Sequence, residues 1–267
     1  MPVMNPSNEF QNYTYTLPPN RQLLAAKLME KNWFKNTDLS IQKSILSLPD
    51  DFEGFVFDLS NRPDHLGNLE IVRLQKLVSG HELITPVFEV YSQDTQKTFT
   101  KEYVSWKIGR YPGAKGILFI EMQGKITHFI TIETPKFPIG EFTHDALGGI
   151  YQYSKEDIAD LPAQIKKIVK TKLGLKTLNI KRLIDLGRIF SDNGLTINNP
   201  NIFAAIIDGQ EAKIISKINK SDIQREVLEY KINIVPIEQL DMYIAKIDDV
   251  FFLSIISRLL AKRIISL

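Results

Sequence analysis

Hydrophobic and polar positions near the start of the chain follow a helical spacing. Leu23, Leu24, Leu28 and Trp33 approximate one face after Asn20, a residue type that caps helices. This pattern predicts a helix over residues 21–34, and a second short helix over residues 38–48 that Pro49 ends. Residues 1–19 are polar and punctuated by prolines, so we expect them to form a loose arm.

The middle of the chain changes to β-branched and aromatic residues separated by turn-forming residues, a pattern typical of strands. It predicts strands over residues 54–59, 69–78, 83–91 and 98–106, and a hairpin over 116–133 that turns at Gln123-Gly124. A helix from Asp160 to Gly174, strands over 181–189, 202–208 and 229–236, and helices over 237–245 and 248–265 complete the prediction. Helices interleaved irregularly with antiparallel-type strands predict an α+β, or mixed α/β, fold.

Composition excludes several classes of protein. The 267 residues carry 33 Lys and Arg against 31 Asp and Glu, a net charge of +2 that argues against a globally basic nucleic-acid binder. The absence of cysteine excludes disulfides, thiolate zinc sites and cysteine nucleophiles. The histidines lack the spacing of metal ligands, so neither a metal nor a cofactor is predicted; they are His65, His81, His128 and His144.

No targeting or membrane segment is predicted either. Residues 1–20 lack the basic start and apolar core of a signal peptide. The apolar stretch over 250–260 contains two serines and an arginine and is too short to cross a bilayer. We therefore expect a cytoplasmic protein without a membrane partner.

The order of elements after residue 98 resembles the Nudix superfamily, most closely its ADP-ribose pyrophosphatase branch. The similar segments are residues 101–120 (KEYVSWKIGRYPGAKGILFI), Gly148-Gly149, 167–175 (KIVKTKLGL), 187–207 and 234–240 (IVPIEQL). The resemblance implies a Nudix-like mixed sheet flanked by helices over residues 98–267. A helical and β extension over residues 20–97 and the arm over 1–19 would precede it.

The resemblance also implies a catalytic helix whose glutamates hold Mg²⁺ or Mn²⁺, and this sequence lacks them. If Gly174-Leu175 ends the Nudix box, Lys167-Ile168 takes the place of its Arg-Glu pair and Thr171-Lys172 that of its Glu-Glu pair. Residues 164–175 contain no Asp or Glu, and hard divalent cations need oxygen ligands. Lys167 and Lys170, on the former metal face, are candidates to contact phosphates directly; the alternative is a solvated helix face.

Other candidates follow from the position of the substrate cleft in that family. His144 and Asp145 stand just before Ala146-Leu147-Gly148-Gly149, and with Lys136 they are candidate ligand contacts. Asn193, in the polar loop 191–199, is a candidate to contact a sugar. Glu226 and Glu229 lie near the loop that supplies a catalytic base in the family, with a solvated turn as the alternative.

Three functions remain open on sequence alone. The first is a Nudix-like protein that binds a nucleoside-diphosphate-type ligand or a partner without hydrolysing it. The second is an enzyme on the same scaffold, either a pyrophosphatase with relocated carboxylates or a sugar-nucleotide dehydratase or lyase. The segments 101–106, 116–118 and 125–129 resemble the sugar-nucleotide 2,3-dehydratases, but their Leu-Ser-Pro-Thr-Val-Gln stretch is absent.

The third function is a self-associating module. Residues 248–265 are apolar around more than one helical face, so a Nudix-like core would cover only part of them. The remainder requires either the N-terminal helices of the same chain or a second copy, which predicts a homodimer through this helix.

Overall fold

The computed structural model describes residues 6–110, 113–136, 140–149, 161–217 and 231–266. The chain divides into two compact units, each with its own core. Unit 1 comprises residues 1–110 and 192–198, and unit 2 comprises residues 111–191 and 199–267. None of the described helices combines the length and hydrophobicity that spanning a bilayer requires.

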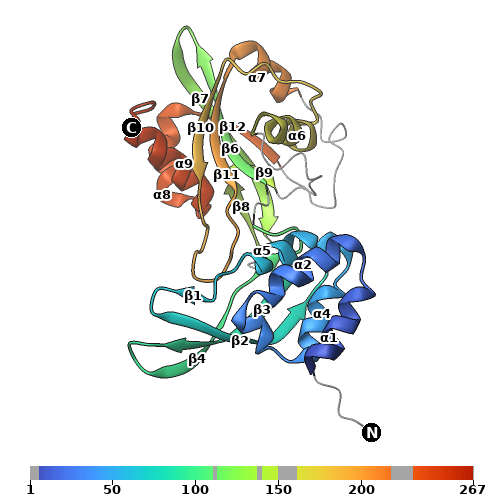
Figure 1. Cartoon of the computed structure of the whole chain (residues 1–267). Helices are drawn as coiled ribbons and strands as arrows, with labels where there is room; N and C mark the ends of the chain where they lie inside the picture. Colours follow the sequence, from blue (N-terminus) through green and yellow to red (C-terminus); the bar gives the residue numbers. More distant parts are fainter. Residues whose placement is uncertain (1–5, 111–112, 137–139, 150–160, 218–230, 267) are drawn as a thin grey trace. The chain divides into compact units, whose positions relative to one another are not determined.

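Unit 1 packs short helices against an antiparallel sheet (Figure 1). Its helices are α1 (Pro6–Tyr15), α2 (Pro19–Met29), α3 (Asn32–Lys35), α4 (Leu39–Leu46), the 3-10 turn η1 (Asp50–Phe52) and α5 (Glu53–Ser60). Its strands are β1 (His65–Leu66), β2 (Leu69–Ser79), β3 (Leu83–Ser92), β4 (Lys97–Glu102) and β5 (Ser105–Trp106). They follow the order β1-β2-β3-β4, with β5 also paired to β3.

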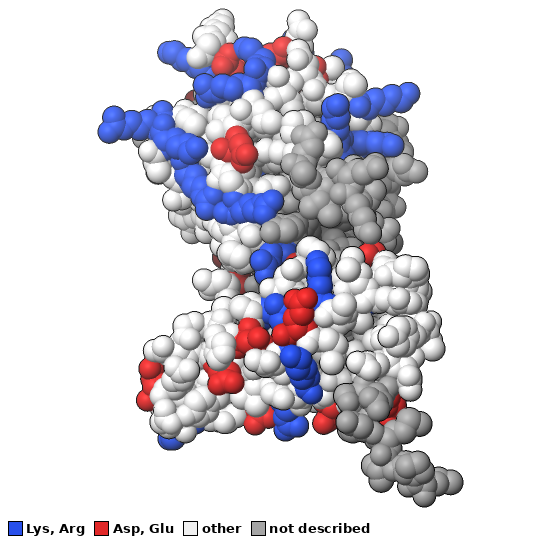
Figure 2. Space-filling view, viewed as in Figure 1, with Lys and Arg blue, Asp and Glu red and all other residues white. Residues whose placement is uncertain are grey.

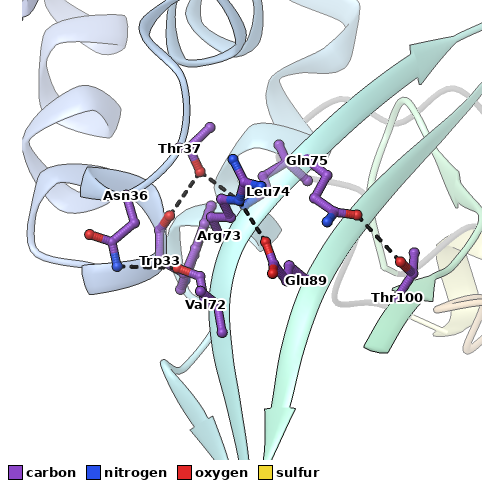
Figure 3. Close-up of polar contacts among 9 residues, drawn as sticks. All are labelled: Trp33, Asn36, Thr37, Val72, Arg73, Leu74, Gln75, Glu89 and Thr100. Atoms are coloured by element: carbon purple, nitrogen blue, oxygen red, sulfur yellow. Dashed lines mark hydrogen bonds and ion pairs between the residues drawn. The ribbon is translucent and has the colours of Figure 1, made fainter. Parts of the chain in front are cut away.

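Side chains from the end of α3 bond the irregular strand β2 (Figure 3). Register shifts leave Val72 and Gln75 without a partner on β3. The Asn36 amide donates to the carbonyl of Val72 at 3.2 Å, and the buried Thr37 hydroxyl accepts from the N–H of Leu74 at 2.9 Å. The bond to Thr37 satisfies a buried backbone N–H of this bulged strand, and the bond from Asn36 is at the surface.

Several predictions for unit 1 need correction. Residues 54–59, predicted as a strand, form α5, because Phe55, Val56 and Leu59 are buried at helical rather than alternating spacing. The helix predicted over 21–34 begins at Pro19, so Asn20 lies in its first turn, and it is interrupted after Met29. Residues 6–15 of the predicted arm form α1.

The first unit also extends past the predicted boundary at residue 97. Strand β4 pairs with β3 from Val87 to Ser92, so residues 97–102 complete the sheet of unit 1. Beyond it, the Lys107 ammonium is buried between the carboxylates of Asp51 at 2.9 Å and Glu82 at 3.0 Å. The division therefore falls after Arg110.

Unit 2 is a mixed sheet with helices on both faces (Figure 1). Its strands are β6 (Ala114–Met122), β7 (Lys125–Lys136), β8 (Glu141–Asp145), β9 (Leu147–Gly149), β10 (Arg182–Arg188), β11 (Asn201–Asp208) and β12 (Lys231–Pro236). The order is β10-β11-β6-β7-β12, with β8 on β7 and β9 on β6; β11 and β6 are parallel and the other pairs antiparallel. This arrangement confirms the predicted α+β class with a mixed sheet flanked by helices.

A separate hydrophobic core lies on each face of this sheet. Helices α6 (Leu161–Leu173) and α7 (Gly209–Ser216) pack on one face, around Leu118, Ile130 and Phe203. The 3-10 turn η2 (Ile237–Gln239), α8 (Leu240–Lys246) and α9 (Val250–Ala261) pack on the other, around Phe119 and Phe129. The predicted hairpin turn is present, with Gln123 and Gly124 both at positive φ, and Gly174, at φ 64°, follows α6 as predicted.

Helix α9 packs one face on the sheet of unit 2. Phe252, Ile255, Ile256 and Leu259 are buried there, and Leu253 and Leu260 pack against the same core. The N-terminal helices belong to the separate core of unit 1. Burial of most of α9 thus requires no second copy, and dimerisation stays a prediction.

Candidate functional site

Strand β8 brings two predicted site residues into contact. Asp145 lies opposite Ile132 of β7, on the face of the sheet that α6 covers. Its carboxylate forms an ion pair with the ammonium of Lys136 and accepts hydrogen bonds from Thr134 at 2.8 Å and Thr143 at 2.9 Å. The Asp145 side chain is 4% exposed, whereas that of Lys136 is 39% exposed. The Asp145 carboxylate is therefore buried and holds Lys136 in place. The Lys136 ammonium is the member of the pair that an anion from solvent can approach.

His144 points to the opposite face of the sheet. Its ring packs edge-to-face on Tyr243 of α8, with ring centroids 5.4 Å apart, and its Nδ1 lies 3.5 Å from the amide nitrogen of Asn233. A cavity of about 280 Å³ opens here, lined also by Phe142 and Met242. Because strand neighbours alternate between faces, His144 and Asp145 cannot serve one site on the same face.

Two further charged residues, which the sequence did not suggest, lie beside Ala146 and within electrostatic range of Asp145. The Asp249 carboxylate caps α9 by accepting the N–H of Phe251 at 3.1 Å, and it also accepts the N–H of Ala146 at 2.7 Å. Burial raises the pKa of Asp249, against the opposing effect of Lys115. Burial likewise lowers the pKa of Lys115, whose ammonium lies 5.5 Å from the ring centre of Phe251.

The sequence contains a local indication of both Lys115 and Asp249. Lys115 is a charge in the otherwise apolar strand Ala114–Ile120, and Asp249 directly precedes an apolar helix, where an N-cap is expected. What the sequence could not supply is their proximity to each other, because Lys115 and Asp249 belong to elements far apart in the chain.

The candidate lysines of α6 lie on the side of the helix that is not packed into the core. The helix packs Ile165, Ile168, Val169 and Leu173 into the core, while Lys170 is exposed and Lys167 is half-buried. Lys136 lies on the same face of the sheet as α6.

The remaining candidates lie outside the described part of unit 2. Asn193 is exposed in the loop 192–198, which is part of unit 1. Glu226 and Glu229 lie outside the described residues. Over the described ranges, no group of three or more His, Asp and Glu side chains converges in a way that could hold a metal ion.

Comparisons with known proteins find similarity in structure but none in sequence. No protein-family model matches the sequence, and no curated protein does. A solved structure described as the crystal structure of an ADP compounds hydrolase matches 74% of this chain and 94% of its own, with a TM-score of 0.49 and 12% sequence identity. Similarity at this level identifies neither a family nor an activity.

Replacing Asp249 by asparagine is expected to change how the stability of unit 2 depends on pH. The folded-state pKa lies above the reference value of 3.8, so the folded chain binds the proton more tightly than the unfolded chain. The free energy of unfolding of the parent therefore falls as pH rises from about 3.8 through the folded-state pKa. Since the variant cannot titrate there, it gains relative stability across that window, by about 1.4 kcal/mol for each unit of pKa elevation.

Urea denaturation followed by circular dichroism between pH 3.5 and 8 measures this difference. Asp208→Asn, which alters the N-cap of α7 where Asp208 accepts from Gln210 and Glu211, is the matched control for losing a capping carboxylate. A difference between Asp249→Asn and the parent that stays constant with pH would contradict the prediction.

Proposed function

We propose that unit 2 binds a phosphate-containing ligand of the nucleoside-diphosphate type on its α6 face, without a divalent metal and without hydrolysing it. The observation that carries this proposal is the composition of α6. It presents Lys166, Lys167, Lys170 and Lys172 and no carboxylate over Leu161–Leu173. A helix of this charge attracts phosphate oxygens directly and offers no ligand to Mg²⁺.

The position of α6 in the fold supports the proposal. The helix packs on the same face of the mixed sheet as Lys136, whose ammonium is partly exposed beside the buried Asp145. The resemblance of residues 99–260 to the ADP-ribose pyrophosphatase branch gives the ligand class. Self-association remains a separate proposal, which sedimentation equilibrium tests.

A thermal-shift titration with ADP-ribose and UDP-glucose, in EDTA and in Mg²⁺, tests the binding. We expect the midpoint to rise with ligand to the same extent in both buffers, because binding to the native state stabilises it. Release of nucleoside monophosphate at enzymatic rates, abolished by EDTA, would contradict the absence of hydrolysis.

Reversing two charges on α6 is expected to abolish this shift. Lys167→Glu/Lys170→Glu places carboxylates where phosphates would approach, so we expect at least a ten-fold loss of affinity, and parent binding should weaken with salt. Lys213→Glu/Lys217→Glu reverses two exposed charges at α7, on the same face of the sheet, and is the matched control. If both double variants bind like the parent, the lysines of α6 are a solvated face.

A further inference from the structure

An open groove of about 780 Å³ lies on the α8–α9 side of the unit 2 sheet, the face opposite α6. The tip of the β6–β7 hairpin, the start of β10, η2 and the segment after α9 form its walls. Its volume falls in the range of about 300–1,000 Å³ that is usual for small-molecule sites. The apolar lining consists of branched aliphatic side chains: Ile126, Ile206, Ile237, Leu260, Ile264 and Ile265.

The polar lining of the groove has an excess of positive charge. Lys125, Arg182 and Arg263 are exposed, and within the described residues no ion pair or side-chain hydrogen bond engages them. The acidic residue of the lining, Glu121, is already paired with Lys181 outside the groove. Figure 2 shows Lys and Arg gathered in a curved run over the part of unit 2 that carries β10 and the C-terminal helices, with few acidic side chains among them.

Arg263 occupies a backbone position where glycine is usual. The N–H of Ile264 donates to the carbonyl of Leu259 at 3.0 Å and that of Arg263 to Leu260 at 2.9 Å, which is the Schellman pattern at the end of α9. Arg263 takes the left-handed position of this motif, with φ 55°. An arginine in the left-handed conformation has a higher backbone free energy than a glycine would have there. Its side chain adds a positive charge to the groove.

We propose that this groove binds a single-chain anionic amphiphile. The hydrocarbon chain lies on the aliphatic lining, where its removal from water favours binding. The carboxylate or phosphate head lies against Lys125, Arg182 and Arg263. This groove lies on the face of the sheet opposite α6. The proposal of a ligand here therefore does not depend on the proposed function.

Charge also favours this ligand over a second copy of the chain. A two-fold interface brings the same patch of both copies together, so the cations around one groove would face their own equivalents. Such a contact leaves like charges opposed, whereas an anionic head group neutralises them.

A fluorescent fatty acid, 11-(dansylamino)undecanoate, tests the proposal below its micellar concentration. We expect saturable binding that laurate or dodecyl phosphate displaces, and that dodecanol displaces at least ten-fold less effectively because it lacks the charge. Displacement by laurate alone identifies a carboxylate ligand, and displacement by dodecyl phosphate alone identifies a phosphate; either supports the proposal. Absence of saturable binding, or equal displacement by dodecanol, would overturn it.

Two variants separate the roles of charge and shape. Arg182→Glu/Arg263→Glu should weaken binding at least ten-fold, while Lys213→Glu/Lys217→Glu, on the opposite face, should leave it unchanged. Ile264→Trp keeps every cation but fills the groove, and should weaken binding to a similar degree. Parent-like affinity in both groove variants would refute the site, as would a dimer in sedimentation equilibrium that Ile264→Trp dissociates.

Discussion

Replacing Gly148 by alanine is expected to destabilise unit 2 by about 3–5 kcal/mol, a large part of the about 5–15 kcal/mol that stabilises a typical domain. Gly148 pairs with Lys115 in the β9–β6 ladder at φ 149°, a conformation that side chains rarely adopt. A Cβ there would lie 2.2 Å from the carbonyl oxygen of Ala114 and 3.0 Å from the Cα of Lys115. Since both are backbone atoms of β6, only separation of the strands relieves the contact.

Gly140 supplies the matched control for this prediction. It also has a positive φ, of 70°, but nothing lies within 4 Å of its missing Cβ. Gly140→Ala should therefore cost only the conformational penalty, about 1 kcal/mol. Equal costs for the two variants would show that the contact with β6 is not what requires glycine at 148.

The unfolding of the two units can be followed with different spectroscopic signals. Both tryptophans, Trp33 and Trp106, belong to unit 1. Urea unfolding followed by tryptophan fluorescence therefore reports on unit 1, while far-ultraviolet circular dichroism reports on both. We expect Gly148→Ala to move the dichroism transition to lower urea, with a smaller effect on the fluorescence transition.

Replacing Lys136 by methionine is expected to cost about 2–3 kcal/mol, because it leaves the buried carboxylate of Asp145 without its cation. The hydroxyls of Thr134 and Thr143 still donate to this carboxylate, but they are neutral. The cost stays below that of a fully buried pair because the Lys136 side chain is 39% exposed.

A double variant distinguishes the cost of leaving a buried carboxylate unpaired from the cost of losing the packing of the Lys136 side chain. Lys136→Met/Asp145→Val removes both charges, so we expect it to recover at least half of the stability that Lys136→Met loses. Lys231→Met is the matched control, since its ammonium lies 3.8 Å from Glu133 and its side chain is 65% exposed; it should cost less than about 0.5 kcal/mol. A double variant less stable than Lys136→Met would mean that Asp145 stabilises the strand without its partner.

Local patterns predicted the elements whose signals are local. The hairpin turn at Gln123-Gly124 and the end of α6 at Gly174 were predicted because positive φ favours particular residues. A short apolar run such as residues 54–59 has the same pattern in a buried strand and in a buried helix, so the pattern predicts a strand where the structure has a helix. Only the burial of that segment in the core of unit 1, where α5 contacts α2, distinguishes the two.

The candidate site was predictable residue by residue but not as an arrangement. Lys136 and Asp145 were both candidates, yet their contact depends on the pairing of β7 with β8. His144 was grouped with Asp145 by sequence position, and strand alternation sends the two to opposite faces. The proximity of Lys115 to Asp249 cannot be predicted from local sequence, because it depends on how α9 packs against β6.

The inclusion of residues 192–198 in unit 1 has a consequence for how the protein is made. In an isolated β-bridge of unit 1, the N–H of Val104 donates to the carbonyl of Leu195 at 2.7 Å, and the N–H of Ile197 donates to the carbonyl of Val104 at 3.3 Å. During synthesis from the N-terminus, residues 1–110 leave the ribosome well before these partners exist. Unit 1 therefore reaches its complete hydrogen bonding only after most of unit 2 has been translated, and a fragment ending at Arg110 would leave both backbone groups of Val104 to water.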